Sequence, residues 1–156
     1  MSSAYVIRHA KAKSRVKWTE PDEVRPLTKR GRREAEALAE RLGDEPFARL
    51  VSSPYLRCVQ TLEPLAMATG LPIETTELLS EGGDAARVVE LLLTLARDEP
   101  IACCTHGDVV FDVARTVASR GVPLDGPYDV PVASAWILEV RFDGFAEGRF
   151  MERPPT

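Results

Sequence analysis

The length and charge of the chain exclude several classes of protein. Its 156 residues fit one domain, large enough to bury a core without disulfide or metal support. With 44% hydrophobic and 28% charged residues the chain is not a disordered one, and its net charge of −4 argues against a nucleic-acid coat or a polybasic membrane surface. We therefore expect a single domain over residues 1–156 that binds neither nucleic acid nor membrane.

The cysteines and the apolar stretches indicate a reducing compartment. The chain has three cysteines, two of them adjacent, and this number and spacing do not form a disulfide framework. No stretch has the composition of a secretory signal or a membrane span, and the apolar run at residues 88–96 is interrupted by Glu90 and Thr94. A cytoplasmic location is the simplest expectation.

The first elements in chain order are a strand, a long loop and a helix. The apolar residues 4–8 predict a buried strand that ends at His9. Residues 11–27 are polar and contain two prolines, which is typical of a functional loop. Thr28 then caps a predicted helix over residues 28–42, and Gly43 stops it.

The middle of the chain predicts a second strand and two helices. Residues 50–52 form the strand, and Ser53-Pro54 opens a helix towards residue 69, with Ser53 as its cap. We expect Pro64 to kink or interrupt that helix. Residues 73–79 predict a weak strand or an extended loop, and Asp84 begins the next helix.

The last third predicts another strand-to-histidine junction and a hairpin. Residues 101–105 form a strongly apolar strand that ends at His106, and Asp108 is expected to cap the following helix. Residues 132–142 and 147–151 predict a hairpin. Strands that alternate with helices in this way indicate an α/β fold with a largely parallel sheet and helices on both faces.

The candidate functional residues follow predicted strands. Ligands of such sheets bind beyond the carboxyl ends of the strands, where His9, Ser53 and His106 all fall. A lone core histidine is usually structural, but both histidines of this chain lie at this edge. A neutral imidazole can attack phosphorus, and an ordinary pKa near 6.5 makes it a usable nucleophile at cellular pH.

Phosphoryl transfer also needs guanidinium groups to neutralise the transferring oxygens. Arg8 adjoins His9, and Arg57 lies one turn into the helix that Ser53-Pro54 opens, where the helix dipole adds to its charge. A solvated surface position is the alternative interpretation of Arg57.

Other phosphatase chemistries fit the sequence less well. No cysteine is followed by arginine at the spacing that a cysteine-based phosphatase needs, and no Asp-x-Asp occurs. A zinc or manganese hydrolase would need more histidines and clustered carboxylates. A Cys104–His106 pair on one strand face is conceivable, but a cysteine within an apolar run is usually inert.

Four motifs in order resemble the histidine phosphatase superfamily, in its small SixA-like, phosphoglycerate mutase-like variant. They are spread over about two-thirds of the chain. His106-Gly107-Asp108 departs from the His-Asn-Pro of many SixA relatives, and this region looks closer to phosphatase domains appended to some Nudix hydrolases. The motifs are Tyr5-Val6-Ile7-Arg8-His9-Ala10-Lys11-Ala12, Arg25-Pro26-Leu27-Thr28-Lys29-Arg30-Gly31, Ser52-Ser53-Pro54-Tyr55-Leu56-Arg57-Cys58-Val59-Gln60-Thr61 and Thr105-His106-Gly107-Asp108.

The resemblance implies a fold and a set of roles. The fold would be a three-layer α/β/α sandwich with a mostly parallel mixed sheet. His9 would be phosphorylated transiently, Arg8, Arg57 and His106 would form the phosphate pocket, and neither a metal nor another cofactor would be required. Glu81 lies where larger members place a general acid.

Two points stay open at this level. Asp22 is a second candidate for the general acid, and a solvated loop position is the alternative interpretation of Glu81. The substrate would be a phosphomonoester or a phosphohistidine on a protein, since residues 70–84 leave little room for a lid. The alternatives are a nucleotide or another small-metabolite phosphate, or a catalytically silent phosphate-binding or docking module.

Overall fold

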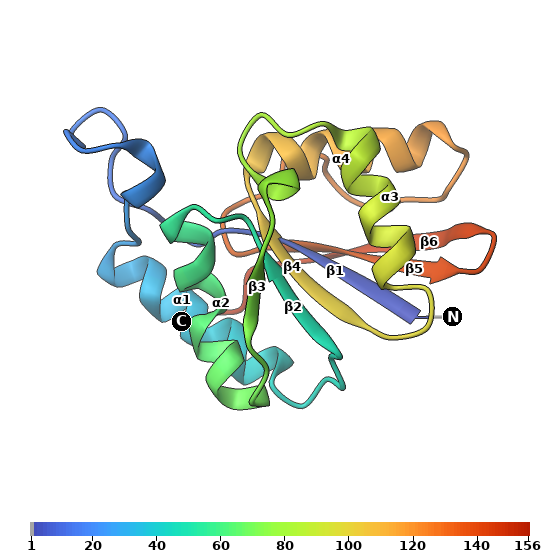
Figure 1. Cartoon of the computed structure of the whole chain (residues 1–156), viewed down its shortest axis with the longest axis horizontal. Helices are drawn as coiled ribbons and strands as arrows, with labels where there is room; N and C mark the ends of the chain where they lie inside the picture. Colours follow the sequence, from blue (N-terminus) through green and yellow to red (C-terminus); the bar gives the residue numbers. More distant parts are fainter. Residues whose placement is uncertain (1) are drawn as a thin grey trace.

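The computed structural model describes residues 2–156 and contains one six-stranded mixed sheet. Helices lie on both faces of this sheet, and two single-turn 3₁₀ helices lie in the connecting loops (Figure 1). The elements in chain order are β1 (Ser2–Arg8), η1 (Asp22–Val24), α1 (Lys29–Leu42), β2 (Arg49–Ser52), α2 (Leu56–Thr69), β3 (Ile73–Thr75), η2 (Glu77–Leu79), α3 (Ala85–Leu95), β4 (Ile101–Thr105), α4 (Gly107–Ser119), β5 (Ala135–Arg141) and β6 (Gly144–Met151).

The strand order is β3-β2-β4-β1-β5-β6, with the β1 and β4 strands at its centre. Strands β3, β2, β4 and β1 pair in parallel, whereas β5 and β6 form an antiparallel hairpin on the β1 side. This is the three-layer sandwich with a mostly parallel mixed sheet that the sequence predicts.

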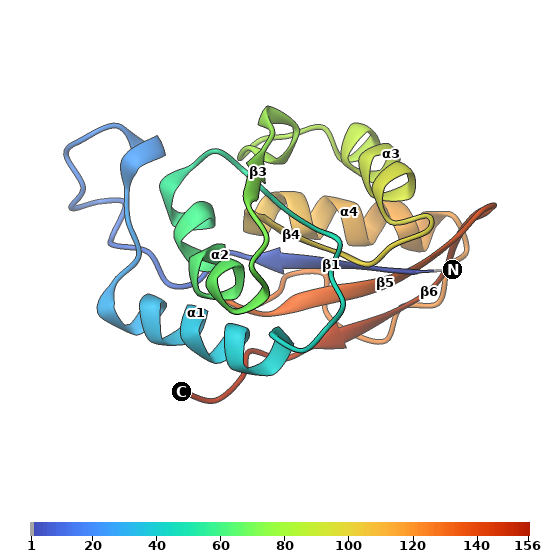
Figure 2. The same ribbon diagram turned by 60° about the horizontal axis from the view of Figure 1, so that its bottom comes forward.

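Each central strand supplies side chains to two separate cores because successive residues point to opposite faces. On β1, Ala4 and Val6 pack with α3 and α4, while Tyr5 and Ile7 pack with α1 and α2. The turned view shows α1 and α2 together below the sheet and α3 and α4 above it (Figure 2). Both cores are well buried, so the sheet between them is a rigid support for the loops at its edge.

Two helix starts match the sequence prediction. The Thr28 hydroxyl accepts a hydrogen bond from the Gly31 amide at 3.0 Å, and the Asp84 carboxylate accepts one from the Ala86 amide at 2.9 Å. Both residues cap their helices as expected.

The two other predicted caps are wrong. Helix α2 begins at Leu56 after an N-cap at Tyr55, because the Ser53 hydroxyl contacts His106 instead of capping a helix. Helix α4 has His106 as its N-cap, and the Asp108 carboxylate in its first turn accepts a hydrogen bond from the Gly82 amide at 2.8 Å. In both cases a tertiary contact takes the side chain that local sequence assigned to a cap.

Pro64 does not interrupt α2, which is continuous from Leu56 to Thr69. The interruption expected from sequence is therefore wrong, since the helix packs on both sides of Pro64 through the buried Leu62 and Leu65. Tertiary packing here outweighs the hydrogen bond that proline removes.

Candidate active site

His9 follows β1 at the carboxyl edge of the sheet. Its amide donates to the Thr105 carbonyl at 3.0 Å, which ties the residue to the end of the neighbouring strand β4. Its ring nitrogen Nδ1 lies 2.8 Å from the carbonyl oxygen of Ala10. A carbonyl oxygen can only accept, so Nδ1 carries the ring proton and the lone pair lies on Nε2. His9 is thus held in the tautomer in which Nε2 can act as a nucleophile.

His106 lies directly beside His9, at the end of β4. The two ring centroids are 5.5 Å apart, and the His106 side chain is buried. Its Nε2 lies 2.9 Å from the Ser53 hydroxyl, whereas its buried Nδ1 has no hydrogen-bond partner within residues 2–156. The structure therefore brings together the two histidines that sequence reasoning singled out.

Burial keeps both imidazoles neutral at cellular pH. Desolvation lowers the pKa of His9 to about 4, and the charges of Arg57 and Arg8 act in the same direction. Desolvation also lowers the pKa of His106 to about 3, helped by the neighbouring His9 and Arg57. The neutral, nucleophilic form of His9 therefore stays populated to a lower pH than the neutral form of an ordinary histidine.

Arg8 is held close to the start of α4. Its Nη1 donates to the carbonyl oxygen of Val130 at 2.6 Å, and its Nε is buried without a partner in the described part of the chain. A Cβ atom on Gly107 would lie 2.9 Å from both Cζ and Nε of Arg8. The glycine that follows His106 thus leaves the space that the guanidinium occupies.

Arg57 is fully buried and is not a solvated surface residue. Its Nη1 donates to the carbonyl oxygen of Asp22 at 2.9 Å, and its Nη2 donates to the Asp22 carboxylate at 3.0 Å. The guanidinium also lies over the ring of Tyr55, 5.0 Å from the centroid. In this structure η1 therefore covers Arg57 and supplies it with a counter-ion.

Asp22 joins two arginines, of which sequence reasoning had assigned only Arg57 to the site. The second is Arg25, whose Nε donates to the Asp22 carboxylate at 2.9 Å and whose side chain is 6% exposed. Burial pushes the pKa of Asp22 upward, but hydrogen bonds and charges from Arg25 and Arg57 outweigh it and hold the pKa below its ordinary value. Asp22 is thus an ionised bridge between the two guanidiniums.

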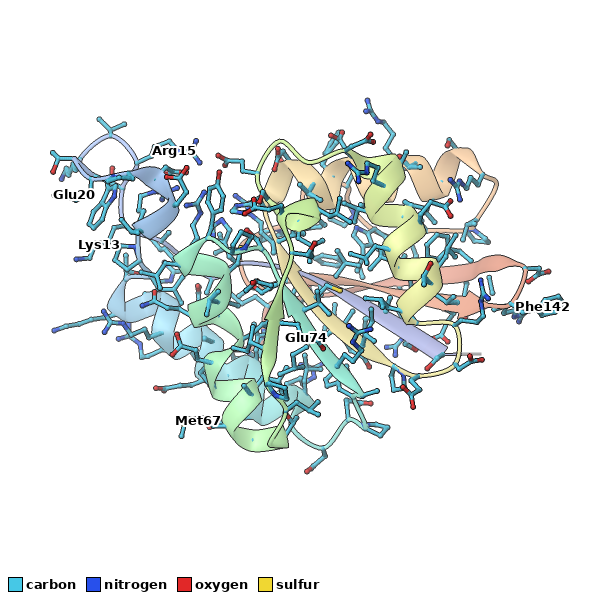
Figure 3. The ribbon with its side chains drawn as sticks, in the orientation of Figure 1. Lys13, Arg15, Glu20, Met67, Glu74 and Phe142 are labelled. Atoms are coloured by element: carbon cyan, nitrogen blue, oxygen red, sulfur yellow. The ribbon has the colours of Figure 1, made fainter. Side chains whose placement is uncertain are left out.

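Glu81 lies at the same place, on the loop that follows η2. Its carboxylate accepts a hydrogen bond from Arg15 at 2.7 Å and lies 3.6 Å from Arg57. Arg15, labelled in Figure 3, projects from the segment between β1 and α1 and is the other cation that sequence reasoning missed. Arg15 and Arg25 both lie in a polar loop without hydrophobic periodicity. For Arg25, the only sequence signal was its place in a motif that resembles the family.

A cavity of about 730 Å³ opens over these groups. Its wall contains Arg8 and His9 together with cationic side chains of the segment between β1 and α1. Arg57 and His106 are buried and do not belong to the lining. Lys11 and Arg25 add positive charge to the wall, and Asp108, Asp112 and Asp129 add negative charge. The lining residues are Arg8, His9, Lys11, Ala12, Arg15, Arg25, Glu81, Gly107, Asp108, Phe111, Asp112, Asp129 and Val132.

The loop after His9 is fixed by motif residues of α2. The Thr61 hydroxyl accepts from the Ala10 amide at 2.9 Å and donates to the Arg57 carbonyl at 2.7 Å. The Gln60 side chain accepts from the Leu27 amide at 2.8 Å, at the far end of the same loop. The sequence spacing Arg-x-x-Gln-Thr therefore links the nucleophile loop, the long polar loop and the buried arginine.

Metal and membrane features are both absent from residues 2–156. No group of three or more His, Cys, Asp or Glu side chains there could hold a metal ion. Among the same residues, no helix is both long and apolar enough to cross a membrane.

The fold and the site define an α/β protein with two imidazoles and buried guanidiniums at the carboxyl edge of its sheet, which are the groups that phosphoryl transfer requires. A model of the histidine phosphatase superfamily (branch 1) matches residues 4–86, more than half of the chain. The chain belongs to the histidine phosphatase superfamily.

Similar proteins differ in the substrates that their names give. An 8-oxo-(d)GTP phosphatase of Mycolicibacterium smegmatis is 32% identical over 154 residues, which are 96% of this chain and 48% of that protein. The chain thus spans about half the length of this curated relative.

Solved structures share the fold at lower identity. The protein histidine phosphatase SixA in complex with tungstate has a TM-score of 0.77 and 22% identity, with 97% of each chain covered. A mycobacterial glucosyl-3-phosphoglycerate phosphatase in complex with VO₃ has a TM-score of 0.74 and 20% identity, with 96% of this chain and 97% of that chain covered.

Proposed function

We propose that the protein is a phosphatase that hydrolyses a phosphomonoester or a protein phosphohistidine through a covalent phosphohistidine at His9. One observation carries this proposal: Nδ1 of His9 is tied to the Ala10 carbonyl at 2.8 Å, which leaves the Nε2 lone pair free beside His106. A neutral imidazole in this tautomer needs no further proton transfer before it attacks phosphorus.

The reaction proceeds in two displacements. Arg8, Arg57 and His106 bind the phosphoryl oxygens, and His9 Nε2 forms a bond to phosphorus as the bond to the leaving group breaks. The leaving group takes up a proton as it departs. Water then attacks the phosphohistidine, the N–P bond breaks, and inorganic phosphate leaves the neutral imidazole behind.

Glu81 is the better candidate for the acid that protonates the leaving group. The Glu81 residue lines the cavity, although it also contacts Arg15 and Arg57, whereas Asp22 is not part of the cavity lining and hydrogen bonds from Arg25 and Arg57 hold its pKa below the ordinary value. A carboxyl whose pKa is lowered is a poor proton donor at neutral pH.

The mechanism is tested by trapping the intermediate. Wild-type protein incubated with a labelled phosphoester should acquire an acid-labile, alkali-stable phosphate on His9. His9→Ala should lose turnover by several orders of magnitude while its thermal unfolding stays close to wild type. Turnover at the wild-type rate in His9→Ala would exclude the proposal. Absence of turnover in the wild type would leave the phosphate-binding or docking module as the better description.

The first substrate class is a phosphorylated side chain of a protein. Between Gly70 and Asp84 the structure has only the short strand β3 and the single-turn η2, so no helical lid covers the site from this segment. An open approach of this kind suits a histidine carried by a folded protein.

Nucleotides are the second class, and two observations favour them. The relative with 32% identity is named an 8-oxo-(d)GTP phosphatase. Lys11, Arg15 and Arg25 also line the cavity beyond the groups needed for one phosphoryl group, and further phosphates would bind such cations.

Parallel measurement of kcat/KM on a phosphohistidine protein and on nucleoside mono-, di- and triphosphates decides between the classes. A preference for the protein of 100-fold or more would support the first, and this threshold corresponds to about 2.7 kcal/mol of transition-state binding. The reverse preference would support the second.

A further inference from the structure

The Ser53 hydroxyl lies in an unusual position for the serine of a Ser-Pro helix start. It is fully buried after β2, and its Oγ is 2.9 Å from Nε2 of His106. The same oxygen accepts a longer hydrogen bond, 3.2 Å, from the Tyr55 amide. Since one donor already points at this oxygen, the hydroxyl hydrogen is free to be given to an acceptor.

Two arrangements of the proton on His106 can be compared by their hydrogen bonds. If Ser53 donates to Nε2, the hydroxyl and Nε2 are both satisfied and only an Nδ1–H is left without a partner. If Nε2–H instead donates to Ser53, the hydroxyl hydrogen has no other acceptor within residues 2–156, and the Nδ1 lone pair is buried without a donor. The first arrangement leaves fewer buried polar groups unpaired, so it is the more stable one.

A second contact acts in the same direction. The thiol of Cys58 lies 3.6 Å from the same Nε2 and can serve as a weak donor to it. The other ring nitrogen, Nδ1, is buried and has no hydrogen-bond partner among the described residues. The N–H on Nδ1 is therefore the one polar group of the ring that a ligand has to satisfy.

We propose that Ser53 is a positioning residue that fixes His106 in its Nδ1–H tautomer, so that the neutral ring presents an N–H donor to an oxygen of the transferring phosphoryl group. The inference rests on the phosphatase function proposed above. It assigns to Ser53 a role that acts through His106, without contact with the reacting atoms.

The charge state of His106 makes the tautomer matter. Burial lowers the pKa of this ring to about 3, so it is neutral at cellular pH and has a single N–H. A doubly protonated ring would offer donors on both nitrogens and would need no help from Ser53. With one proton, a ring in the other tautomer would turn a lone pair towards the phosphoryl oxygens and repel them.

Nitrogen NMR of the free protein tests the tautomer directly. The chain has two histidines, so His9→Asn identifies the imidazole signals of His106. In wild type we expect the non-protonated nitrogen of His106 to be Nε2. In Ser53→Ala we expect the Nε2–H form to rise, while the signals of His9 stay in place as an internal reference. A wild-type ring protonated on Nε2, or no change in Ser53→Ala, would overturn the proposal.

Ser52→Ala is the matched control. Ser52 is equally buried and adjacent, but its hydroxyl donates to the Ser53 carbonyl at 2.8 Å and does not touch His106. This variant controls for the loss of a buried hydroxyl near β2. It should leave the tautomer of His106 unchanged.

Binding of inorganic phosphate supplies the functional measurement. Loss of a hydrogen bond to a charged ligand should weaken phosphate binding by Ser53→Ala roughly 10- to 100-fold, with a smaller change in Ser52→Ala. Ser53→Thr keeps the hydroxyl and should restore both the tautomer and the affinity. A shifted tautomer with unchanged phosphate affinity would contradict the proposed role.

These measurements separate two kinds of failure. The tautomer and phosphate affinity are read without turnover, so an inactive wild type would reject the phosphatase function and leave them interpretable. If Ser53→Ala does not fold, the wild-type tautomer and Ser53→Thr still decide the matter, because an Nε2–H ring in either would contradict the role of Ser53.

Discussion

Single backbone atoms orient several side chains of the candidate site. The Ala10 carbonyl fixes the tautomer of His9, the Val130 carbonyl holds the guanidinium of Arg8, and the Asp22 carbonyl holds that of Arg57. A carbonyl that belongs to a packed strand end or loop cannot rotate away as a side chain can. The charged groups are therefore pre-organised, which lowers the cost of arranging them around a phosphoryl group.

Glu81→Gln is expected to separate substrates by their leaving groups. The amide cannot donate a proton as an acid does, so hydrolysis of an alkyl phosphate should fall by ~10²–10⁴-fold. Phosphohistidine has a good leaving group, and its hydrolysis should change little. Steady-state kinetics on both substrates give the ratio.

Glu77→Gln is the control for this change, because Glu77 lies in η2 on the same loop but outside the cavity wall. It should leave both rates unaltered. An equal loss on both substrates in Glu81→Gln would mean that Glu81 acts through Arg15 and Arg57 rather than as an acid.

At the scale of elements, the segment between β1 and α1 depends on close packing against the first turn of α1. The carbonyl oxygen of Lys11 accepts from the Thr28 amide at 2.9 Å and from the Thr28 hydroxyl at 3.2 Å. A Cβ atom on Gly31 would come within van der Waals overlap of this same oxygen. Gly31, the glycine of the Thr-x-x-Gly motif, therefore leaves the space in which the backbone of Lys11 packs against α1.

Gly31→Ala should destabilise the protein, although glycine-to-alanine changes inside helices usually stabilise by ~1 kcal/mol. The added methyl must displace the backbone of Lys11, so we expect a net loss of roughly 1–3 kcal/mol in the free energy of unfolding, as for other overpacked sites. Urea unfolding measures it. Glu36→Ala, at an exposed position of the same helix, should change the stability by less than ~0.5 kcal/mol. A stabilised Gly31→Ala would show that the loop does not need this contact.

Sequence patterns predicted the elements better than their ends. The strand over residues 101–105 has the predicted bounds, because every one of its residues is buried and the apolar run marks it fully. The predicted caps of α2 and α4 were wrong. Ser53 and Asp108 are residue types that commonly cap helices, but here their side chains contact His106 and the Gly82 amide instead. Local sequence cannot show which tertiary partner a polar side chain will prefer.

The site was predicted in part for the same reason. His9 and His106 follow strands and Arg8 is the last residue of one, and parallel strands bring their carboxyl ends to one edge. Arg15 and Arg25 come from a long loop whose path depends on Asp22, Glu81 and the docking to α2. An arginine that reaches into a site and one that faces solvent look alike in sequence.

At the scale of the whole molecule, two hydrophobic cores share a single sheet. The strands β1, β2 and β4 contribute to both, so loss of one core would expose the other face of the same strands. The β5–β6 turn, with the exposed Phe142 labelled in Figure 3, lies at one end of the longest axis of the molecule. We therefore expect both cores to unfold in one cooperative transition that includes the site.

The two histidines should make the free energy of unfolding depend on pH. Their pKa values are lower in the folded protein, about 4 and about 3, than the ordinary 6.5, so the unfolded chain binds more protons between these values. The folded state should thus lose stability as pH falls from 7 towards 5. Urea unfolding across this window measures the slope.

The variant with both His9→Asn and His106→Asn should show a flat profile over the same pH range, whatever its absolute stability. An equally steep slope in this variant would assign the effect to other groups.

The contact between Asp22 and Arg57 has a consequence for how the anion enters and leaves. In the proposed reaction, a phosphoryl group that binds Arg57 has to displace the Asp22 carboxylate that is bound there in this structure. The net electrostatic gain is smaller than that of filling an empty cationic pocket, and added salt should therefore affect KM only weakly. If the proposed reaction holds, we expect the Asp22 carboxylate to rebind Arg57 as inorganic phosphate leaves, so that inhibition by added phosphate is weak.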